Sequence, residues 1–311
     1  MNLIAIDLEW NTATRSSKID PELAAKMMFE IIEVGAVRMD KDLDVVERFQ
    51  RHVLPVLYKR IQWHIAAVTN RTQQSLYHGD PFDQVAQDLK KFIGDNAVLA
   101  SWGTSDSDVL LSNIRFHPTA PDLAFRAINI QAIFSGLAEG TTRGNQRSIE
   151  YALDFFRLDK DLPFHEAISD ATYAARILAE TLRLRIAECP NETIDSLLRP
   201  YLYNPFLNSQ CEERMELSSE EDILETLESR SYACPACGKT ITGDWTVIKA
   251  DKSWFAKAAC PDHGDIEILA KRMRRTKIPR LHIRTRIPQG PMIVPEPALD
   301  ETPLVWLDPE A

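Results

Sequence analysis

No run of apolar residues in this 311-residue sequence is long enough to cross a lipid bilayer, which excludes a helical transmembrane protein. The first residues contain no basic leader, and Asp7 and Glu9 interrupt their apolar run well before signal-peptide length. Cysteine is scarce: three of the five residues share a metal-type spacing, so Cys189 and Cys211 are expected to be free thiols rather than parts of a disulfide framework. We therefore predict a cytoplasmic protein without a membrane partner.

An overall basic charge, common in nucleic-acid-binding proteins, is also absent, because the formal net charge is −10. The charge is distributed unevenly: residues 1–230 sum to −12, residues 231–290 to +7, and residues 291–311 to −5. Only the middle segment is therefore attractive to phosphate groups. With 44% hydrophobic and 26% charged residues, the composition is that of a globular protein with one main domain and one small module.

The apolar pattern predicts an α/β fold. Segments rich in Ile, Val, Leu and Phe predict opening strands at 2–10, 31–39 and 46–54. A helical stripe follows and ends at Gly94; its members are Phe82, Val85, Leu89 and Phe92. Strands at 97–101 and 126–130 then alternate with helices at 107–114, 131–138, 147–156 and 169–187. This order predicts a mixed sheet that is covered by helices on both faces.

Changes in composition divide the chain into four parts. Residues 1–188 contain the strand and helix pattern and form the main domain. Residues 189–230 are acidic, with prolines at the front and a helical stretch near the end, and are expected to be a linker. Residues 231–287 form a small basic module, and the proline-rich, acidic residues 288–311 form a tail.

Two acidic residues occupy the first predicted strand. Because side chains alternate along a strand, Asp7 and Glu9 project from the same face. The strand is otherwise apolar, and an unpaired carboxylate pair in a core carries a heavy desolvation penalty. Buried acids of this kind usually hold a metal ion. The alternative is a pair of solvated acids at a sheet edge.

A third acid occurs directly after a predicted strand, in the segment 101–111. Asp106 has the better placement relative to the following apolar residues, and Asp108 is the alternative. Either residue could instead cap the helix that begins there, because carboxylates accept hydrogen bonds from the free amides of a first helical turn.

A histidine and an acid precede the strongly apolar last helix of the main domain. His165 and Asp170 are separated by four residues in a loop that leads into this helix. Asp170 could complement the helix dipole, and His165 could be an ordinary loop histidine. The two together are better explained by catalysis.

These three blocks resemble the DnaQ-like, or DEDDh, exonucleases, which have a ribonuclease H-like fold. Asp7 and Glu9 match the first block, Asp106 the second, and His165 with Asp170 the third, over residues 1–188. The Asp-Leu-Glu start and the helix that follows Asp170 are similar to the RNase T and ERI-type branch, which trims the 3′ ends of RNA. A sister class has a tyrosine that is separated from its last acid by three residues, but the corresponding residue here is Glu166, which indicates the histidine class.

The resemblance implies a 3′→5′ exonuclease that hydrolyses phosphodiester bonds with two divalent cations, Mg²⁺ or Mn²⁺. Asp7, Glu9, Asp106 and Asp170 would bind the cations, and His165 would be the general base. Paired cations activate a water and stabilise the leaving oxygen, and carboxylates suit these hard ions. Trp10 is a candidate for stacking on the terminal nucleotide or, alternatively, a core tryptophan.

The remaining cysteines predict a structural zinc site in a zinc-ribbon-like module. Cys234 and Cys237 form a Cys-x2-Cys pair, and after twenty-two intervening residues Cys260 and His263 form a Cys-x2-His pair. Each pair can wrap a tetrahedral ion, and a glycine follows each one. The module is too small for a large core, so one Zn²⁺ is expected to supply much of its folding energy.

The end of this module is basic. If residues 280–287 form a strand, Arg280, His282, Arg284 and Arg286 share one face, which could follow a phosphate backbone. The alternative is a solvated face that offsets the acidic remainder of the chain.

The leading hypothesis is thus an exonuclease that acts on single-stranded 3′ ends, of RNA rather than DNA. Two alternatives remain: a DNA 3′→5′ exonuclease, and a non-catalytic nucleic-acid-binding protein with the same fold. The complete set of four acids with His165 argues against the second alternative.

Overall fold

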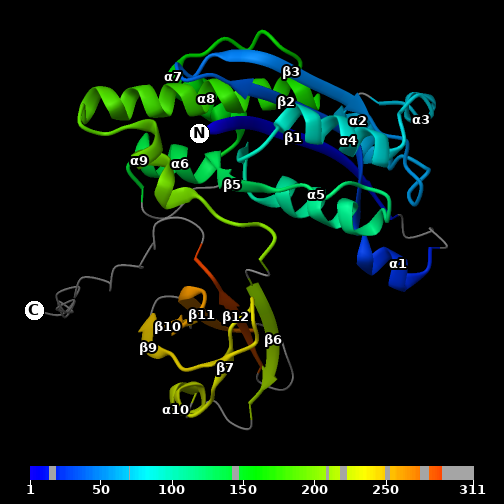
Figure 1. The fold of residues 1–311 in the computed structure, drawn as a ribbon. Helices are drawn as coiled ribbons and strands as arrows, with labels where there is room; N and C mark the ends of the chain where they lie inside the picture. The colour runs from blue at the N-terminus through cyan, green and yellow to red at the C-terminus, as the bar shows by residue number, and fades with distance from the viewer. Residues whose placement is uncertain are drawn as a thin grey trace, which may run out of the picture. The chain divides into compact units, whose positions relative to one another are not determined.

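The computed structural model describes residues 1–13, 19–69, 71–141, 147–207, 210–217, 223–248, 253–273 and 280–288. The chain divides into two compact units, and the boundary falls between Phe206 and Leu207. Each unit has its own β-sheet, as Figure 1 shows. Among the described residues, no helix combines the length and the apolar character that crossing a membrane requires.

The first unit is built on a five-stranded mixed sheet. Its strands are β1 (Asn2–Thr12), β2 (Phe29–Met39), β3 (Val45–His52), β4 (Ala97–Ser101) and β5 (Phe125–Asn129), in the order β3-β2-β1-β4-β5. The β1, β2 and β3 strands pair antiparallel, whereas β1, β4 and β5 pair parallel. The predicted mixed sheet is confirmed.

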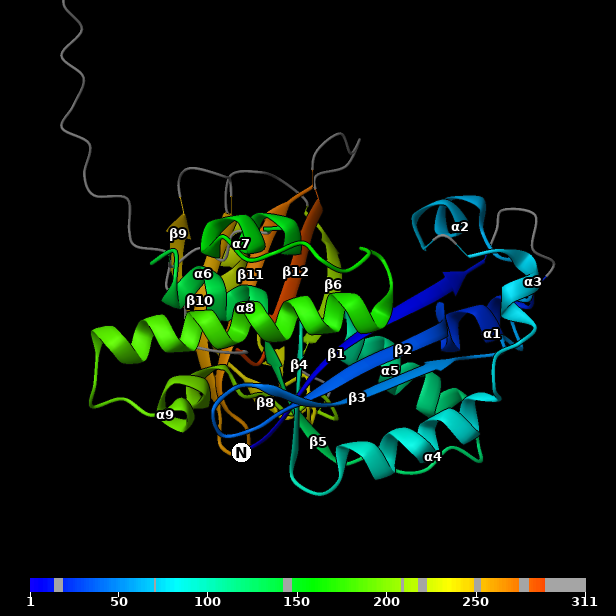
Figure 2. The ribbon, with the colours of Figure 1, turned by 90° about the horizontal axis from the view of Figure 1, so that it is seen from above.

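Helices cover both faces of this sheet (Figure 2). One core cluster contains residues of α6 (Ile130–Leu137), α7 (Ile149–Phe156), α8 (Ala167–Glu188) and α9 (Ile194–Leu198). The opposite cluster contains residues of α4 (Phe82–Ile93) and α5 (Ser105–Phe116). The shorter helices α1 (Pro21–Lys26), α2 (Trp63–Thr69) and α3 (Gln73–Leu76) lie in the connections that flank the strands. The apolar stripe of α4 is buried as predicted, and Gly94 ends the helix with a φ of 64°.

The alternation of side chains along β1 determines which face of the sheet carries the acids. Leu3 and Ala5 belong to the cluster beneath α8, whereas Ile4 and Ile6 belong to the opposite cluster. By the same period of two, Asp7 and Glu9 continue the row on the α8 face. The strand therefore directs both carboxylates toward the helix that carries Asp170.

Helix α8 approaches the sheet very closely at Gly35 of β2. A Cβ atom at this position would lie 2.1 Å from the backbone carbon of Ala167 and 2.2 Å from the backbone nitrogen of Ile168. Neither contact can be relieved by rotating a side chain, since both neighbours are backbone atoms. Glycine thus allows the first turn of α8 to rest on β2.

We expect Gly35→Ala to destabilise the protein by about 1–3 kcal/mol, because the added methyl group overpacks this contact. Urea unfolding of the variant and the wild type measures the difference as a shift of the transition midpoint. An unchanged midpoint would show that α8 does not need this close approach.

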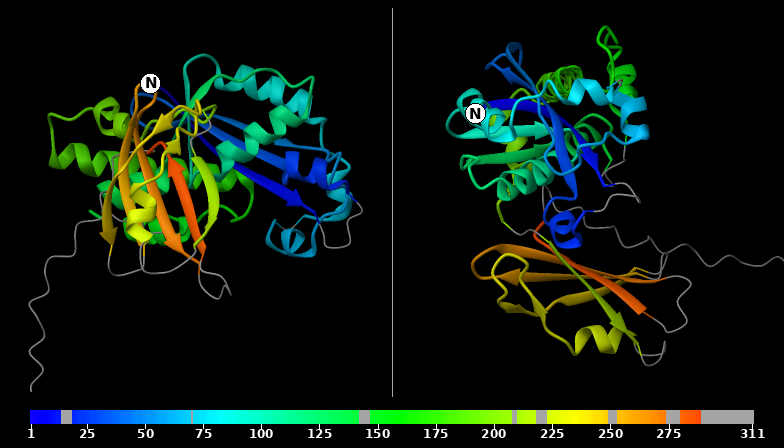
Figure 3. Two further views of the ribbon diagram at one scale, coloured as in Figure 1. Left: turned by 90° about the horizontal axis from the view of Figure 1, so that it is seen from below. Right: turned by 90° about the vertical axis from the view of Figure 1, so that its right-hand side faces the viewer.

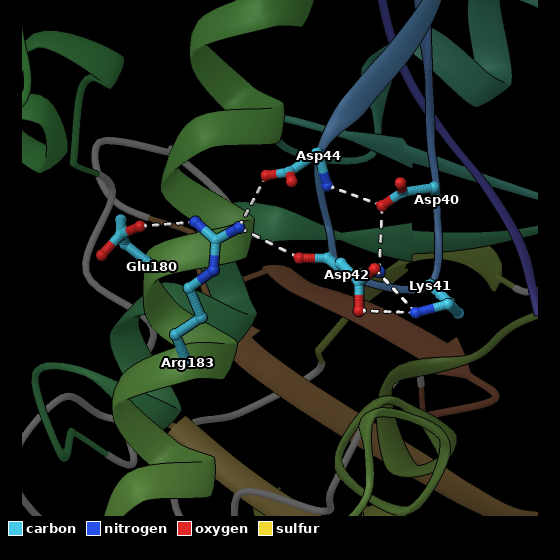
Figure 4. Close-up of polar contacts among 6 residues, drawn as sticks. All are labelled: Asp40, Lys41, Asp42, Asp44, Glu180 and Arg183. Atoms are coloured by element: carbon cyan, nitrogen blue, oxygen red, sulfur yellow. Dashed lines mark hydrogen bonds and ion pairs between the residues drawn. The ribbon is translucent and has the colours of Figure 1, made fainter.

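The C-terminal half of α8 is also fastened to the sheet, at the turn between β2 and β3 (Figure 4). Arg183 donates to the backbone oxygen of Asp42 at 3.0 Å and to the Asp44 carboxylate at 2.9 Å. The turn itself is held by Asp40, whose carboxylate accepts from the backbone nitrogens of Asp42 and Asp44. Two separate anchors therefore fix α8 relative to β2.

The second unit contains a five-stranded antiparallel sheet (Figure 3). Its strands are β6 (Gln210–Glu216), β9 (Asp244–Ile248), β10 (Ser253–Cys260), β11 (Gly264–Arg272) and β12 (Arg280–Arg286), in the order β6-β12-β11-β10-β9. A hairpin of β7 (Tyr232–Ala233) and β8 (Thr240–Ile241) and helix α10 (Ile223–Glu228) complete the unit. Its core includes Leu227, Ile268 and Ile283, which are fully buried.

The segment 189–230, expected to be a linker, is divided between the two units. Leu197, Leu198 and Tyr201 pack into the core of the first unit, and β6 is an edge strand of the second sheet. The reason is that this acidic segment carries apolar side chains that both cores bury. Of the predicted tail, residues 289–311 lie outside the described residues, as does the side chain of Cys211.

Candidate active site and Cys3His site

Three predicted acids from two distant parts of the chain meet on the α8 face of the sheet. Carboxylate oxygens of Asp7 and Glu9, on β1, and of Asp170, in the first turn of α8, all lie within 4.8 Å of one another. Asp170 is buried, and its Oδ1 atom has no hydrogen-bond partner among the described residues. A buried carboxylate oxygen without a donor is suited to a cation.

The fourth acid, Asp106, approaches from α5. Its Oδ1 atom accepts a hydrogen bond from the backbone nitrogen of Leu8 at 3.0 Å. That donor is free because β4 pairs with β1 only as far as Ala5. Asp106 is buried and near enough to raise the pKa of Asp7, although it is not part of the group whose oxygens meet within 4.8 Å, whereas the side chain of Asp108 is exposed. The geometry thus favours Asp106 over Asp108, as the sequence did.

Burial and mutual repulsion raise the pKa values of these carboxyl groups. Burial raises the pKa of Asp7 well above its usual value, and the neighbouring Asp106 and Asp170 add to the effect. Burial, followed by repulsion from Asp170, raises the pKa of Glu9 to about 8, and burial raises the pKa of Asp106 to about 7. Full ionisation of the cluster at neutral pH therefore requires compensating positive charge, which divalent cations with a preference for oxygen ligands provide.

His165 lies beside this cluster in a fixed position. Its backbone nitrogen donates to Oδ2 of Asp170 at 3.0 Å, and its φ of 63° is in the left-handed region. The side chain is exposed to solvent. The exposed imidazole has a ring nitrogen that can accept a proton from a water molecule beside these carboxylates.

A fifth acid, Glu33, was not among the predicted site residues. It is the register partner of Glu9 on β2, it is completely buried, and its charge contributes to the raised pKa values of Asp7 and Glu9. Arg71 forms an ion pair with Glu33 at 2.5 Å, and Gln50 donates to it at 2.8 Å. The available signal was a second acid, three residues after Glu30, in a strand of mostly apolar residues.

Trp10 packs against the core cluster on the face of the sheet opposite to α8. Its ring packs 5.8 Å from that of Phe29 and against the core cluster that includes α4 and α5. This position agrees with the alternative of a core tryptophan, and Trp10 is not part of the function proposed below.

The four predicted zinc ligands come together in the second unit. Cys234 and Cys237 lie in the β7–β8 hairpin, and Cys260 and His263 lie in the turn between β10 and β11. The Cys237–Cys260 sulfur separation is 3.7 Å, and His263 Nδ1 lies 3.7 and 3.6 Å from the sulfurs of Cys234 and Cys260. A tetrahedral ion with ordinary Zn–S and Zn–N bonds sets such separations at about 3.6–3.8 Å.

The two turns are shaped and joined by local interactions. Gly238 and Gly264 both have a φ of 73°, a left-handed backbone that glycine adopts readily. Lys239 of the first turn forms an ion pair with Asp262 of the second. The hydrogen bond with His263 lowers the pKa of the Cys260 thiol to about 6, which favours the thiolate that binds metal.

The basic residues of β12 share one face as predicted, because Leu281, Ile283 and Thr285 are buried between them. Most of their charge is, however, already compensated. Arg280 pairs with Glu216 of β6, and Arg286 pairs with Glu267 of β11. His282 and Arg284 also have interaction partners.

This fold and carboxylate cluster agree with the family comparison. Residues 4–178, more than half of the chain, match the model of the RNase T exonuclease family. The chain belongs to this exonuclease family. The predicted class, a hydrolase of the DEDDh 3′→5′ exonuclease type with a ribonuclease H-like fold, is thereby confirmed, and family members use divalent metal ions.

Several solved exonuclease structures are similar to the chain. The nuclease domain of 3′hExo, bound to rAMP, is 21% identical, with a TM-score of 0.49 over 62% of this chain and 97% of that one. A 3′-exonuclease that recognises the histone mRNA stem-loop is 22% identical, with a TM-score of 0.47 over 58% and 81%. Escherichia coli exonuclease I with a dT13 oligonucleotide is 12% identical, with a TM-score of 0.47 over 87% and 55%. No curated protein sequence matches the chain.

Proposed function

We propose that this exonuclease removes nucleotides from the 3′ end of single-stranded RNA by a mechanism that uses two Mg²⁺ or Mn²⁺ ions. The main support is the clustering of Asp7, Glu9 and Asp170 within 4.8 Å, with a buried Asp170 oxygen that lacks a hydrogen-bond donor. The RNA preference rests on the Asp-Leu-Glu start and the His-x4-Asp block, which are similar to the RNA-trimming branch of the family.

In this proposal Asp7, Glu9, Asp106 and Asp170 hold the cations. When bound, the cations activate the attacking water and offset the charge that develops on the phosphate and the leaving oxygen. His165 accepts the proton of the water, and its exposed position beside Asp170 supports this role. Arg71 pairs with Glu33, the register partner of Glu9, and offsets part of the negative charge around Glu9.

The second unit has a supporting role in the proposal. Its Cys3His site holds one Zn²⁺, which stabilises the unit rather than taking part in the reaction, because all four protein ligands are present and leave no open position. The cytoplasm remains the proposed compartment, because the scarcity of cysteine outside this site agrees with a reducing environment.

The proposal is tested by digesting 5′-labelled single-stranded RNA and the matched DNA with the purified full chain and Mg²⁺ or Mn²⁺. We expect a ladder that shortens from the 3′ end, faster on RNA, and no ladder with Asp7→Ala or Asp106→Ala. Asp108→Ala is the matched control and should keep wild-type rates, because its exposed side chain lies outside the cluster.

Each result separates the alternatives. Faster digestion of DNA would replace RNA by DNA as the proposed substrate. Binding of both strands without digestion of either would favour a non-catalytic protein on the same fold.

A further inference from the structure

One tryptophan of the first unit is almost entirely exposed. The side chain of Trp63, the first residue of α2, is 81% accessible, the highest fraction among the large hydrophobic residues described. Its only aromatic neighbour among them is His64, with ring centroids 5.8 Å apart in an edge arrangement. An indole that is exposed to this degree leaves most of its surface open to a planar ligand.

The backbone before Trp63 is held rigidly by buried polar side chains. Asn11, completely buried, donates to the backbone oxygens of Tyr58 and Arg60 and accepts from the backbone nitrogen of Gln62. The carboxylate of Glu30 accepts from the backbone nitrogen of Tyr58 and its two predecessors. The indole is thus carried on an ordered segment, so that binding to it costs little conformational entropy.

The same segment is joined to the catalytic cluster at both ends. Asn11 follows Glu9 by two residues, about 7 Å along β1. Beyond α2, Arg71 pairs with Glu33, which is the register partner of Glu9. Figure 2 shows α2 beside the C-terminal end of β1, against which it packs. The helix that begins with Trp63 is therefore next to the strand that carries Asp7 and Glu9.

Two basic residues, Lys59 and Arg60, precede Trp63 in the same segment. Lys59 and Arg60 are both exposed, and neither forms an ion pair with any residue that the structure describes. Exposed aromatic rings beside free cations are the usual means of binding single-stranded nucleic acid, because bases stack on the rings while the cations follow the phosphates.

We propose that Trp63, with Lys59 and Arg60, forms a binding platform for single-stranded nucleic acid, on which a base upstream of the scissile nucleotide stacks. This inference rests on the proposed function of the carboxylate cluster. It implies that the enzyme binds the nucleic-acid strand at two sites, namely at the 3′ terminal nucleotide and at the platform. Stacking accepts any base, so the platform adds affinity without sequence preference.

The test compares a dinucleotide with a twelve-residue single-stranded oligonucleotide as substrates for Trp63→Ala, Trp63→Phe and the wild type. For the oligonucleotide we expect Trp63→Ala to raise KM about tenfold, which matches the loss of one stacked base, and Trp63→Phe to restore most of the difference. Hydrolysis of the dinucleotide should be unchanged. Phe155→Ala, which removes an exposed ring on α7, is the control, because Figures 1 and 2 both place α7 far from α2.

A second measurement makes the outcome independent of turnover. Fluorescence anisotropy of a labelled oligonucleotide, with full-length protein in an Asp7→Ala background, should show about tenfold weaker binding when Trp63 is also replaced by alanine. Equal binding with and without Trp63, or an equal loss on the dinucleotide and the oligonucleotide, would overturn the platform. Absence of hydrolysis by the wild type would instead count against the proposed function and would leave the anisotropy result to decide on the platform.

Discussion

Replacing His165 by alanine is expected to lower the turnover number about 10²- to 10⁴-fold, because a positioned general base contributes that much to a hydrolysis rate. The four carboxylates remain in place, so cation binding should be kept. Only the backbone nitrogen of His165 touches the cluster, at Asp170, and alanine retains this donor. Single-turnover digestion of labelled RNA measures the rate, and calorimetric titration with Mn²⁺ measures the binding.

A second variant is needed because His165 has a left-handed backbone with a φ of 63°, at which alanine is strained. Asparagine tolerates this region better and also lacks a basic ring nitrogen, so His165→Asn should lose turnover with less effect on stability. His78→Ala, at another exposed histidine, is the control. Wild-type rates in both His165 variants would refute the general-base assignment.

Cys234→Ser is expected to unfold the second unit while the first unit keeps its melting temperature. Metal binding supplies on the order of 10–16 kcal/mol of folding free energy in small zinc modules, and this unit has a core of modest size. The first unit has separate core clusters, which do not depend on the cysteines. Calorimetric melting of the full chain, together with zinc analysis, measures both effects.

Cys189→Ser is the matched control for this experiment. Cys189 is a half-buried thiol at the end of α8 and lies outside the Cys3His set, so its replacement should change neither zinc content nor the second transition. If Cys234→Ser retained one zinc per chain, the ligand assignment would be incorrect.

The order of strands and helices in the first unit followed from local pattern. The strands expected at 97–101 and 126–130 are β4 and β5 within one residue, and α8 covers the helix expected at 169–187. Buried positions at spacings of two or of three and four are properties of short segments, so they can be recognised without knowledge of the fold. The boundary after Phe206 could not be found this way, since only the contacts with α8 show that Leu197 and Leu198 belong to the core of the first unit.

The candidate site likewise depends partly on local residue spacing and partly on contacts between distant residues. The spacing of Asp7 and Glu9 on one strand predicts a shared face, but the approach of Asp170 depends on the contact between α8 and Gly35. The choice between Asp106 and Asp108 depends on one hydrogen bond to Leu8, which is ninety-eight residues away. The involvement of Glu33 depends on the register between β1 and β2.

The sequence by itself therefore determined the exonuclease class, the paired acids and the spacing of the Cys3His ligands, because short motifs of defined residue types and spacing indicate each of these features. The tertiary structure alone decided that β6 joins the second sheet, that Arg280 and Arg286 are paired with glutamates, and that Trp63 is exposed while Trp10 packs against the core. The physical reason is that burial, strand register and ion-pair partners depend on residues far apart in the chain, whereas periodicity and motif spacing depend only on near neighbours.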